Sequence, residues 1–199
     1  LIGVSSIFYP AAFIELAWTA RFVPESGYLF LGGQLTSRSY LLIPQAQLTG
    51  GFAVAAWLAG EHKGDFVVSV GGYHPNFHAP DHYPNHIPRL GISFHLGPAD
   101  IKGGMYFAIT PQCVMMGGSL EASVRQGNLS AFIKMTLDAI IYFEPFHYDV
   151  MISADASVKA DIPLALTTLH IDMHLHLDIH IWGPEISGVA SIDVGPKTF

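Results

Sequence analysis

The chain has 199 residues, of which 50% are hydrophobic, 12% are aromatic and only 13% are charged. This length suits one domain or two small lobes, and the charged fraction is far below the ~25% of average soluble domains. The formal net charge is −7 and no basic stripe is visible, which argues against nucleic-acid binding and against an anionic membrane surface. The single cysteine, Cys113, excludes an intrachain disulfide and is compatible with a reducing compartment such as the cytoplasm.

No stretch of the sequence predicts a transmembrane helix or a signal peptide. The longest apolar runs, such as 52–60, are far shorter than the ~20 residues that a spanning helix needs, and no basic segment opens the chain. The chain begins at Leu1, and its first residues already resemble the interior of a structured protein. We therefore expect a piece of a longer polypeptide, folded as a single all-β domain over 1–199, and its localisation stays open.

Strand-like runs dominate the first seventy residues. They are rich in aromatic and β-branched residues and cover 13–22, 28–37, 50–60 and 65–73. The polar turn 61–64 separates the last two runs. The segment 10–23 is the strongest helix candidate, because its Ala, Leu and Glu favour helix, but its Phe, Ile, Trp, Thr and Val favour strand.

A loop rich in proline and histidine follows at 71–88. Its histidines, His74, His78, His82 and His86, recur at every fourth residue, but four prolines in the same segment forbid a helix. The loop is also the only clear boundary, so the chain has two candidate lobes, 1–70 and 89–199.

Two interpretations of this loop stay open. In the first, it is a rigid, polyproline-like strap that Tyr73, Phe77 and Tyr83 pin against a sheet. In the second, it is a binding loop that presents its imidazoles, Asp81 and the Tyr83 ring to a ligand.

The second half of the chain alternates apolar and polar residues over long windows. Odd positions are apolar over 129–143, and even positions are mostly apolar over 147–162, after a turn that contains Pro145. Period two predicts half-buried strands. Segments 119–126 and 129–143 flank Gly127-Asn128, which predicts a tight hairpin. The fold class is therefore all-β, an antiparallel meander of long strands that forms a barrel-like structure or a two-layer sandwich.

A sheet of this kind must hide its apolar face from water. It can fold onto a second sheet, pack against the remainder of a longer parent chain or a second copy, or hold an apolar ligand such as lipid. These are the partners that the sequence predicts.

The stretch LHIDMHLHLDIHIWGP, 169–184, holds four histidines. Every polar residue up to Trp182 lies at an even position and thus on one face of a strand: His170, Asp172, His174, His176, Asp178 and His180. Same-face neighbours lie ~6.6 Å apart, so His174 and His176 can offer two ligands to zinc or another divalent metal, with a third from a neighbouring strand or the loop. Two alternatives stay open: a solvated face whose aspartates bind the imidazoles, and a pH switch.

Catalytic motifs are absent. The sequence contains no GxSxG, HExxH, P-loop or Rossmann pattern. Cys113 lies in an apolar setting, which favours a buried, inert thiol. We expect no catalytic residue and, apart from the metal considered above, no cofactor.

Short motifs in a fixed order resemble one family. They are GGYHP (71–75), HYP (82–84), PRLGISF (88–94), YFAITP (106–111), GGSLEA (117–122), PFHYD (145–149) and HIWGPEISGVASIDV (180–194). This pattern, which spans roughly 34–194, resembles the domain of unknown function 6603, met in very large bacterial and fungal proteins. The resemblance implies a β-rich segment of a much larger protein and supplies no activity. His74, His82 and His180 match its pattern, whereas His174 and His176 do not clearly belong to it.

Two classes of function follow as hypotheses. The first is a non-enzymatic β-scaffold that assembles with itself or a parent chain, or holds an apolar ligand such as lipid. The alternative is a metal-binding or carbohydrate-directed protein that uses the histidine strand and the loop, with Trp182 or Tyr83 as a stacking surface.

Overall fold

A computed structural model describes residues 11–163 and 167–196, and within these ranges all regular elements are β-strands of one sheet. Eight shorter strands come first: β1 (Ala12–Phe13), β2 (Leu16–Val23), β3 (Tyr28–Leu35), β4 (Tyr40–Leu41), β5 (Ile43–Thr49), β6 (Gly51–Trp57), β7 (Phe66–Val70) and β8 (Leu90–Leu96). Six longer strands follow: β9 (Ala99–Ile109), β10 (Cys113–Gln126), β11 (Leu129–Tyr142), β12 (His147–Pro163), β13 (Thr168–Gly183) and β14 (Ser187–Pro196). None of the described residues forms a helix that could cross a membrane.

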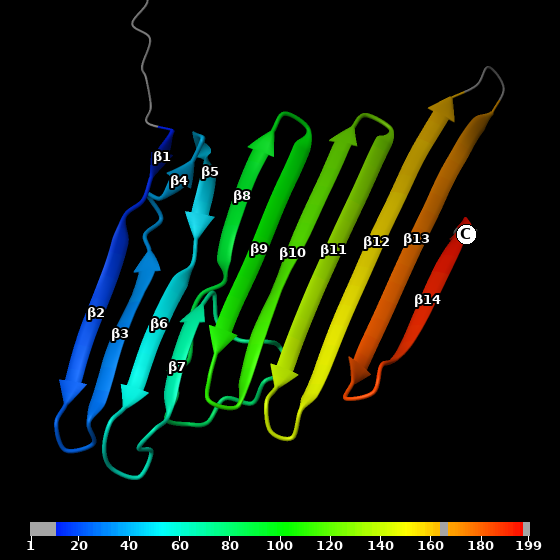
Figure 1. Cartoon of the computed structure of the whole chain (residues 1–199). Coiled ribbons are helices and arrows are strands. Elements are labelled where there is room, and N and C mark those ends of the chain that lie inside the picture. Colours follow the sequence, from blue (N-terminus) through cyan, green and yellow to red (C-terminus); the bar gives the residue numbers. More distant parts are fainter. Residues whose placement is uncertain (1–10, 164–166, 197–199) are drawn as a thin grey trace, which may run out of the picture.

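The strands follow one another as an antiparallel meander (Figure 1). Short strands that are consecutive in the chain act as one bent strand. β5 and β6, for example, are separated only by Gly50 and pair with β8 and β7, and both of these pair with β9. The predicted strands over 129–143 and 147–162 are confirmed as β11 and β12, and the segment 10–23 forms strand rather than helix.

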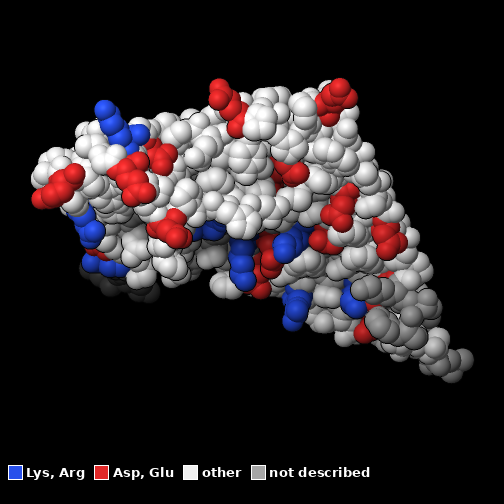
Figure 2. All heavy atoms as spheres, turned by 90° about the horizontal axis from the view of Figure 1, so that it is seen from below, with Lys and Arg blue, Asp and Glu red and all other residues white. Residues whose placement is uncertain are grey.

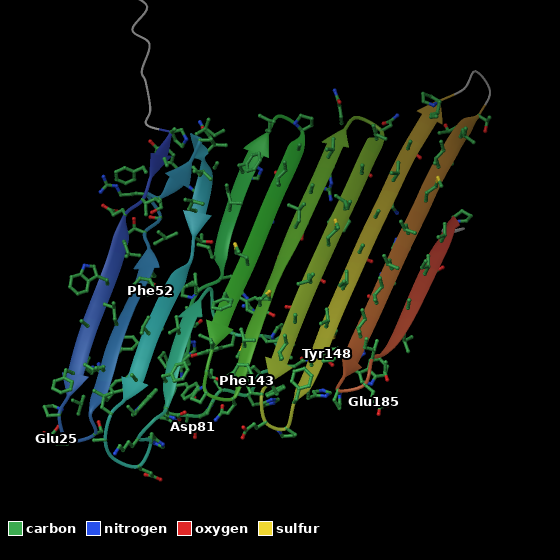
Figure 3. All side chains as sticks on the ribbon, viewed as in Figure 1. Glu25, Phe52, Asp81, Phe143, Tyr148 and Glu185 are labelled. Atoms are coloured by element: carbon green, nitrogen blue, oxygen red, sulfur yellow. The ribbon has the colours of Figure 1, made fainter. Side chains whose placement is uncertain are left out.

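The predicted all-β, antiparallel class is confirmed, but the expected closure into a barrel is wrong. The sheet runs from β1 and β2 at one side to β14 at the other, and the described residues of these edge strands do not pair with each other. Closure would require the strands at the two edges to pair with each other in a staggered register. The described strands form no second sheet over the first either, so side chains project from both faces of a single open layer (Figure 3).

The Pro/His-rich loop interrupts one strand of the sheet. β7 pairs with β9 up to Val70 opposite Phe107, and β8 resumes the same edge at Leu90 opposite Met105. The chain leaves the sheet after Val70 and re-enters it at Leu90, and the β9 partners of these two residues are only two positions apart. Both candidate lobes therefore pair with the same strand. Gly71 makes this possible: its φ is +74°, and a Cβ there would lie 2.4 Å from the carbonyl oxygen of Met105.

Residues 71–89, here named the strap, cover part of one face. The buried side chains beneath the strap come from five strands: Trp57, Val67, Tyr106, Met115 and Ile140. Tyr73 and Phe77 of the strap pack on them, and the buried Tyr83 ring stacks on Trp57 with centroids 5.6 Å apart. The strap interpretation of the loop is therefore confirmed, with the three aromatic anchors that the sequence predicts.

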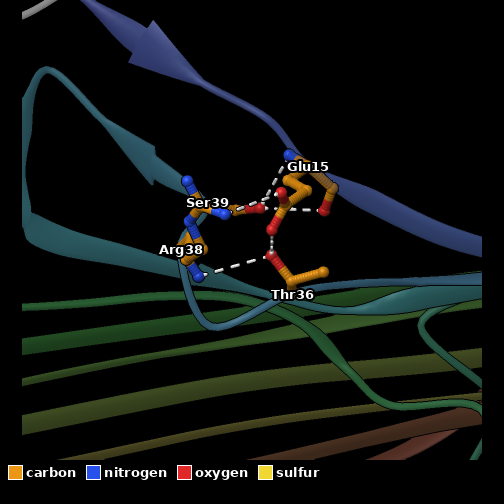
Figure 4. A network of polar contacts seen from close by, with 4 residues as sticks. All are labelled: Glu15, Thr36, Arg38 and Ser39. Atoms are coloured by element: carbon orange, nitrogen blue, oxygen red, sulfur yellow. Dashed lines mark hydrogen bonds and ion pairs between the residues drawn. The ribbon is translucent and has the colours of Figure 1, made fainter.

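A polar cluster holds the bend between β1 and β2 (Figure 4). The Thr36 hydroxyl donates to Glu15 Oε2 at 2.6 Å, and the Arg38 guanidinium lies 3.2 Å from Glu15 Oε1. The buried Ser39 hydroxyl accepts from the Glu15 backbone N–H at 3.0 Å. These contacts join the bend before β2 to the turn between β3 and β4.

Removing a side chain beneath the strap should destabilise the protein far more than removing an equal one at the surface. Ile140 is 3% exposed and Ile186, in the turn before β14, is 89% exposed. We expect Ile140→Ala to lower the free energy of unfolding by about 2–5 kcal/mol and Ile186→Ala to change it by less than about 0.5 kcal/mol. Urea denaturation measures both, and equal effects would contradict the strap as the site of the core.

Candidate functional site

One face of the sheet, here named the apolar face, is apolar from edge to edge. The register defines it: Leu31 lies opposite Val54 and Val54 opposite Val68, and further along Leu137 lies opposite Ile152. Residues on opposite strands that pair directly project from the same face. Followed through β2, β3 and β6 to β14, this face carries no Asp, Glu, Lys or Arg among the described residues.

The apolar face is uncovered. Its large side chains are widely exposed, for example Trp18 at 66%, Phe22 at 58%, Met105 at 56%, Leu120 at 48% and Ile192 at 68%. Figure 2, which views the sheet from below along its strands, shows that charged side chains are sparse among the described residues on this side of the molecule as well. Contiguous apolar patches of this extent mark interaction surfaces in soluble proteins.

The total surface supports this conclusion. The accessible area is 13320 Å², whereas a compact monomer of this size exposes roughly 9,200 Å². An excess of this size is what a single-layer sheet with both faces open over most of its area produces.

The opposite face, here named the polar face, carries the histidine strand. All six predicted residues of β13 lie on it, as the alternation predicts. Three of the imidazoles are held by aspartates: His170 by Asp161 at 2.6 Å, His176 by Asp155 and Asp178 at 2.6 Å each, and His180 by Asp149 at 2.8 Å. Asp172 pairs with Lys159 at 2.9 Å.

These pairs match the interpretation in which aspartates bind the imidazoles. The His174 ring lies parallel to that of His176, with centroids 6.4 Å apart. Both nitrogens of His176 already contact carboxylates, and Asp155 first, then Asp178, raises the pKa of this imidazole. The metal role of this strand stays a prediction.

The strap places its four histidines in different surroundings. His74 is buried between the strap and the sheet. Its backbone N–H contacts the Met115 sulfur at 3.2 Å, and burial lowers the pKa of its ring. His78 and His86 are exposed. His82 is half-buried, and its Nε2 lies 2.7 Å from Asp65 Oδ2. The strap therefore does not gather its imidazoles into one site.

The aromatic residues predicted as stacking surfaces also lie apart in the fold. Trp182 is on β13 and contacts the ring of His180, with centroids 4.6 Å apart. Tyr83 belongs to the strap, and its ring is buried against Trp57 of the sheet. Burial and then its hydrogen bond to Asp65 raise the pKa of the Tyr83 phenol, so this side chain remains a donor.

The sequence interpretation missed two residues that adjoin His82. His62 and Asp65 belong to the turn between β6 and β7. The sequence predicts a polar turn over 61–64, which contains His62, and a strand-like run that begins at Asp65. Together with His82 they place one ligand-type atom each within 4.8 Å of one another, and no other group of three among the described residues does so. The His-x-x-Asp spacing of His62 and Asp65 is a signal for a pair of metal ligands in the turn. The third residue of the group, His82, lies 17 residues beyond Asp65 in the sequence.

A model for a family of unknown function, DUF6603, matches residues 5–198. This chain belongs to DUF6603. The resemblance predicted from the short motifs is thus confirmed over essentially the whole chain, including residues 5–33, which those motifs left unplaced. No curated protein and no solved structure matches the chain. Because DUF6603 carries no described activity, the function of this segment must be argued from its surfaces.

The ion pairs around His176 should make the stability of this DUF6603 chain depend on pH. Its folded-state pKa is raised above 6.5, so the stabilisation is fully present below pH 6.5 and is lost as the pH rises through the folded-state value. We expect the melting temperature to fall slightly over that window, and His176→Gln or Asp155→Asn to remove that part of the change. Equal slopes in all three proteins would contradict the assignment.

Proposed function

We propose that this DUF6603 segment is a non-enzymatic β-scaffold that assembles by packing its apolar face against a second β-sheet, supplied by another copy of the chain. The observation that carries the proposal is the exposed apolar face, along which no described residue from β2 to β14 carries a charge. Burial of such a surface is the main favourable term in most protein association.

The area of this face is sufficient for a stable complex. Strands lie ~4.8 Å apart and rise ~3.3 Å per residue, so β9 to β13 alone cover roughly 1,100 Å². A standard interface buries ~800 Å² per partner. The available face therefore exceeds what a stable dimer needs, before β2, β3, β6 to β8 and β14 are added.

The distribution of charge permits a second copy as the partner. The formal net charge of −7 would make two chains repel each other. The described charged residues of the long strands lie on the polar face, so two apolar faces can meet without bringing like charges together. Sheets that pack face to face interdigitate their side chains at a separation of ~10 Å.

The shape of the face favours a sheet over a single lipid. Small apolar ligands bind in concave sites that bury most of their surface. The hollow on the apolar face lies between β2, β3 and β6, is lined by Phe22, Leu31 and Val54, and is an open groove rather than an enclosed cavity.

A charge placed on the apolar face should disrupt the assembly. Leu120 of β10 is 48% exposed on this face, and Ser123 of the same strand lies on the polar face. We expect Leu120→Lys to raise the dimer dissociation constant at least about 100-fold, because it would bury an unpaired lysine. Ser123→Lys adds the same charge and should leave assembly unchanged. Sedimentation velocity over a concentration series measures both.

Two outcomes would overturn the proposal. If the unmodified chain stays monomeric at high concentration but binds neutral phosphatidylcholine vesicles, and Leu120→Lys abolishes that binding, the apolar face serves lipid. If the chain is a monomer that binds neither itself nor vesicles, the face does not serve assembly or apolar ligands in this segment.

A further inference from the structure

A cluster of three metal-ligand side chains lies where the strap meets the turn between β6 and β7. His62 and Asp65 come from the turn and His82 from the strap, and their ligand atoms all lie within 4.8 Å of one another. Nothing in the assembly proposal uses these residues, since they lie at the end of the sheet that the strap covers rather than on the apolar face.

The turn holds its two ligands by backbone geometry. The Trp57 N–H donates to the Asp65 carbonyl at 2.9 Å, and the Asp65 N–H donates to the His62 carbonyl at 3.0 Å. Gly60 and Gly64 have φ values of +77° and +93°, which residues other than glycine rarely adopt. His62 and Asp65 are therefore brought to one side of a short, closed turn.

The Asp65 carboxylate is oriented by the strap. The Tyr83 hydroxyl donates to Asp65 Oδ1 at 2.9 Å, and this tyrosine is 3% exposed. The other oxygen, Oδ2, faces His82 Nε2 at 2.7 Å. A hydrogen bond from a buried partner to one carboxylate oxygen is the outer-shell contact that fixes a metal-ligating carboxylate in known sites.

The two imidazoles face each other. Their ring centroids lie 3.7 Å apart with an interplanar angle of 4°, and the edge of the His82 ring meets Trp57. Neutral imidazole is the form of this side chain that binds metal. Because each lone pair lies in its ring plane, coordination of one ion requires the rings to tilt apart.

The distances suit a small divalent ion. Bonds of ~2.0–2.1 Å in a tetrahedral site separate neighbouring ligand atoms by about 3.3 Å, between the 2.7 Å of His82 and Asp65 and the 4.8 Å limit of the cluster. Two imidazole nitrogens and one carboxylate oxygen form a set that Zn²⁺ binds. Three protein ligands leave the fourth position free, and the cluster adjoins a groove of about 500 Å³ lined by Arg21, Ser26 and Tyr28.

We propose that His62, Asp65 and His82 form a Zn²⁺ site that ties the strap to the turn between β6 and β7 and keeps one coordination position for water or an exogenous ligand. This site differs from the histidine strand predicted from the sequence, because only His82 was among the predicted residues.

Zinc binding by the whole chain tests the proposal. The purified chain is freed of metal with a chelator, dialysed and titrated with Zn²⁺ alone, and native mass spectrometry counts the ions retained. We expect one Zn²⁺ per chain and a melting temperature raised by several degrees at saturation, because an ion bound only to the folded state stabilises it. Co²⁺ in place of Zn²⁺ should give the visible absorption of a four-coordinate site.

Matched variants locate the ion. His62→Ala and Asp65→Asn should each weaken Zn²⁺ binding by at least about tenfold, whereas His78→Ala, which removes an exposed imidazole from the strap, should leave it unchanged. Asp65→Asn retains an acceptor for Tyr83, so circular dichroism should show it folded. Absence of bound Zn²⁺ in the unmodified chain would overturn the proposal. Loss of binding in a His174→Ala, His176→Ala variant, with binding retained in His62→Ala, would also overturn it and place the ion on β13.

Discussion

The register of the antiparallel ladder is the constraint on which this structure depends. Each long strand pairs with the next almost residue for residue, so the period-two pattern of one strand is passed to its neighbour without a change of phase. As a result the apolar residues of distant strands collect on one face and the charged residues on the other. A slip of one residue at any hairpin would reverse this order for every strand beyond it.

The strap compensates for an exception to that order. At one end of the polar face the residues turn apolar, including Trp57, Val67 and Met115, and the strap covers them with three aromatic rings. This packing gives a single-layer sheet the buried core that it otherwise lacks. It also brings the strap beside the turn between β6 and β7, so the same contact that stabilises the fold assembles His62, Asp65 and His82.

The two faces thus support different roles. The apolar face, free of charge and widely exposed, suits assembly with a second sheet. The polar face carries aspartate–histidine pairs that satisfy one another across strands, as at His176 and Asp155. The cluster of His62, Asp65 and His82 combines two imidazoles with a carboxylate that Tyr83 orients. This arrangement suits a metal ion better than the aspartate–histidine pairs of β13 do.

The sequence by itself determined which face each strand residue occupies, because alternation is a property of consecutive residues; β11, β12 and the polar positions of β13 were predicted on that basis. It also determined the strap, because proline excludes a helix and three aromatic residues need a surface to cover. Only the tertiary structure decided that the sheet stays open, since closure depends on the register between strands. It alone also decided that His82 meets His62 and Asp65, because residues from two loops, 17 to 20 positions apart, are brought together only when the strap packs on the sheet.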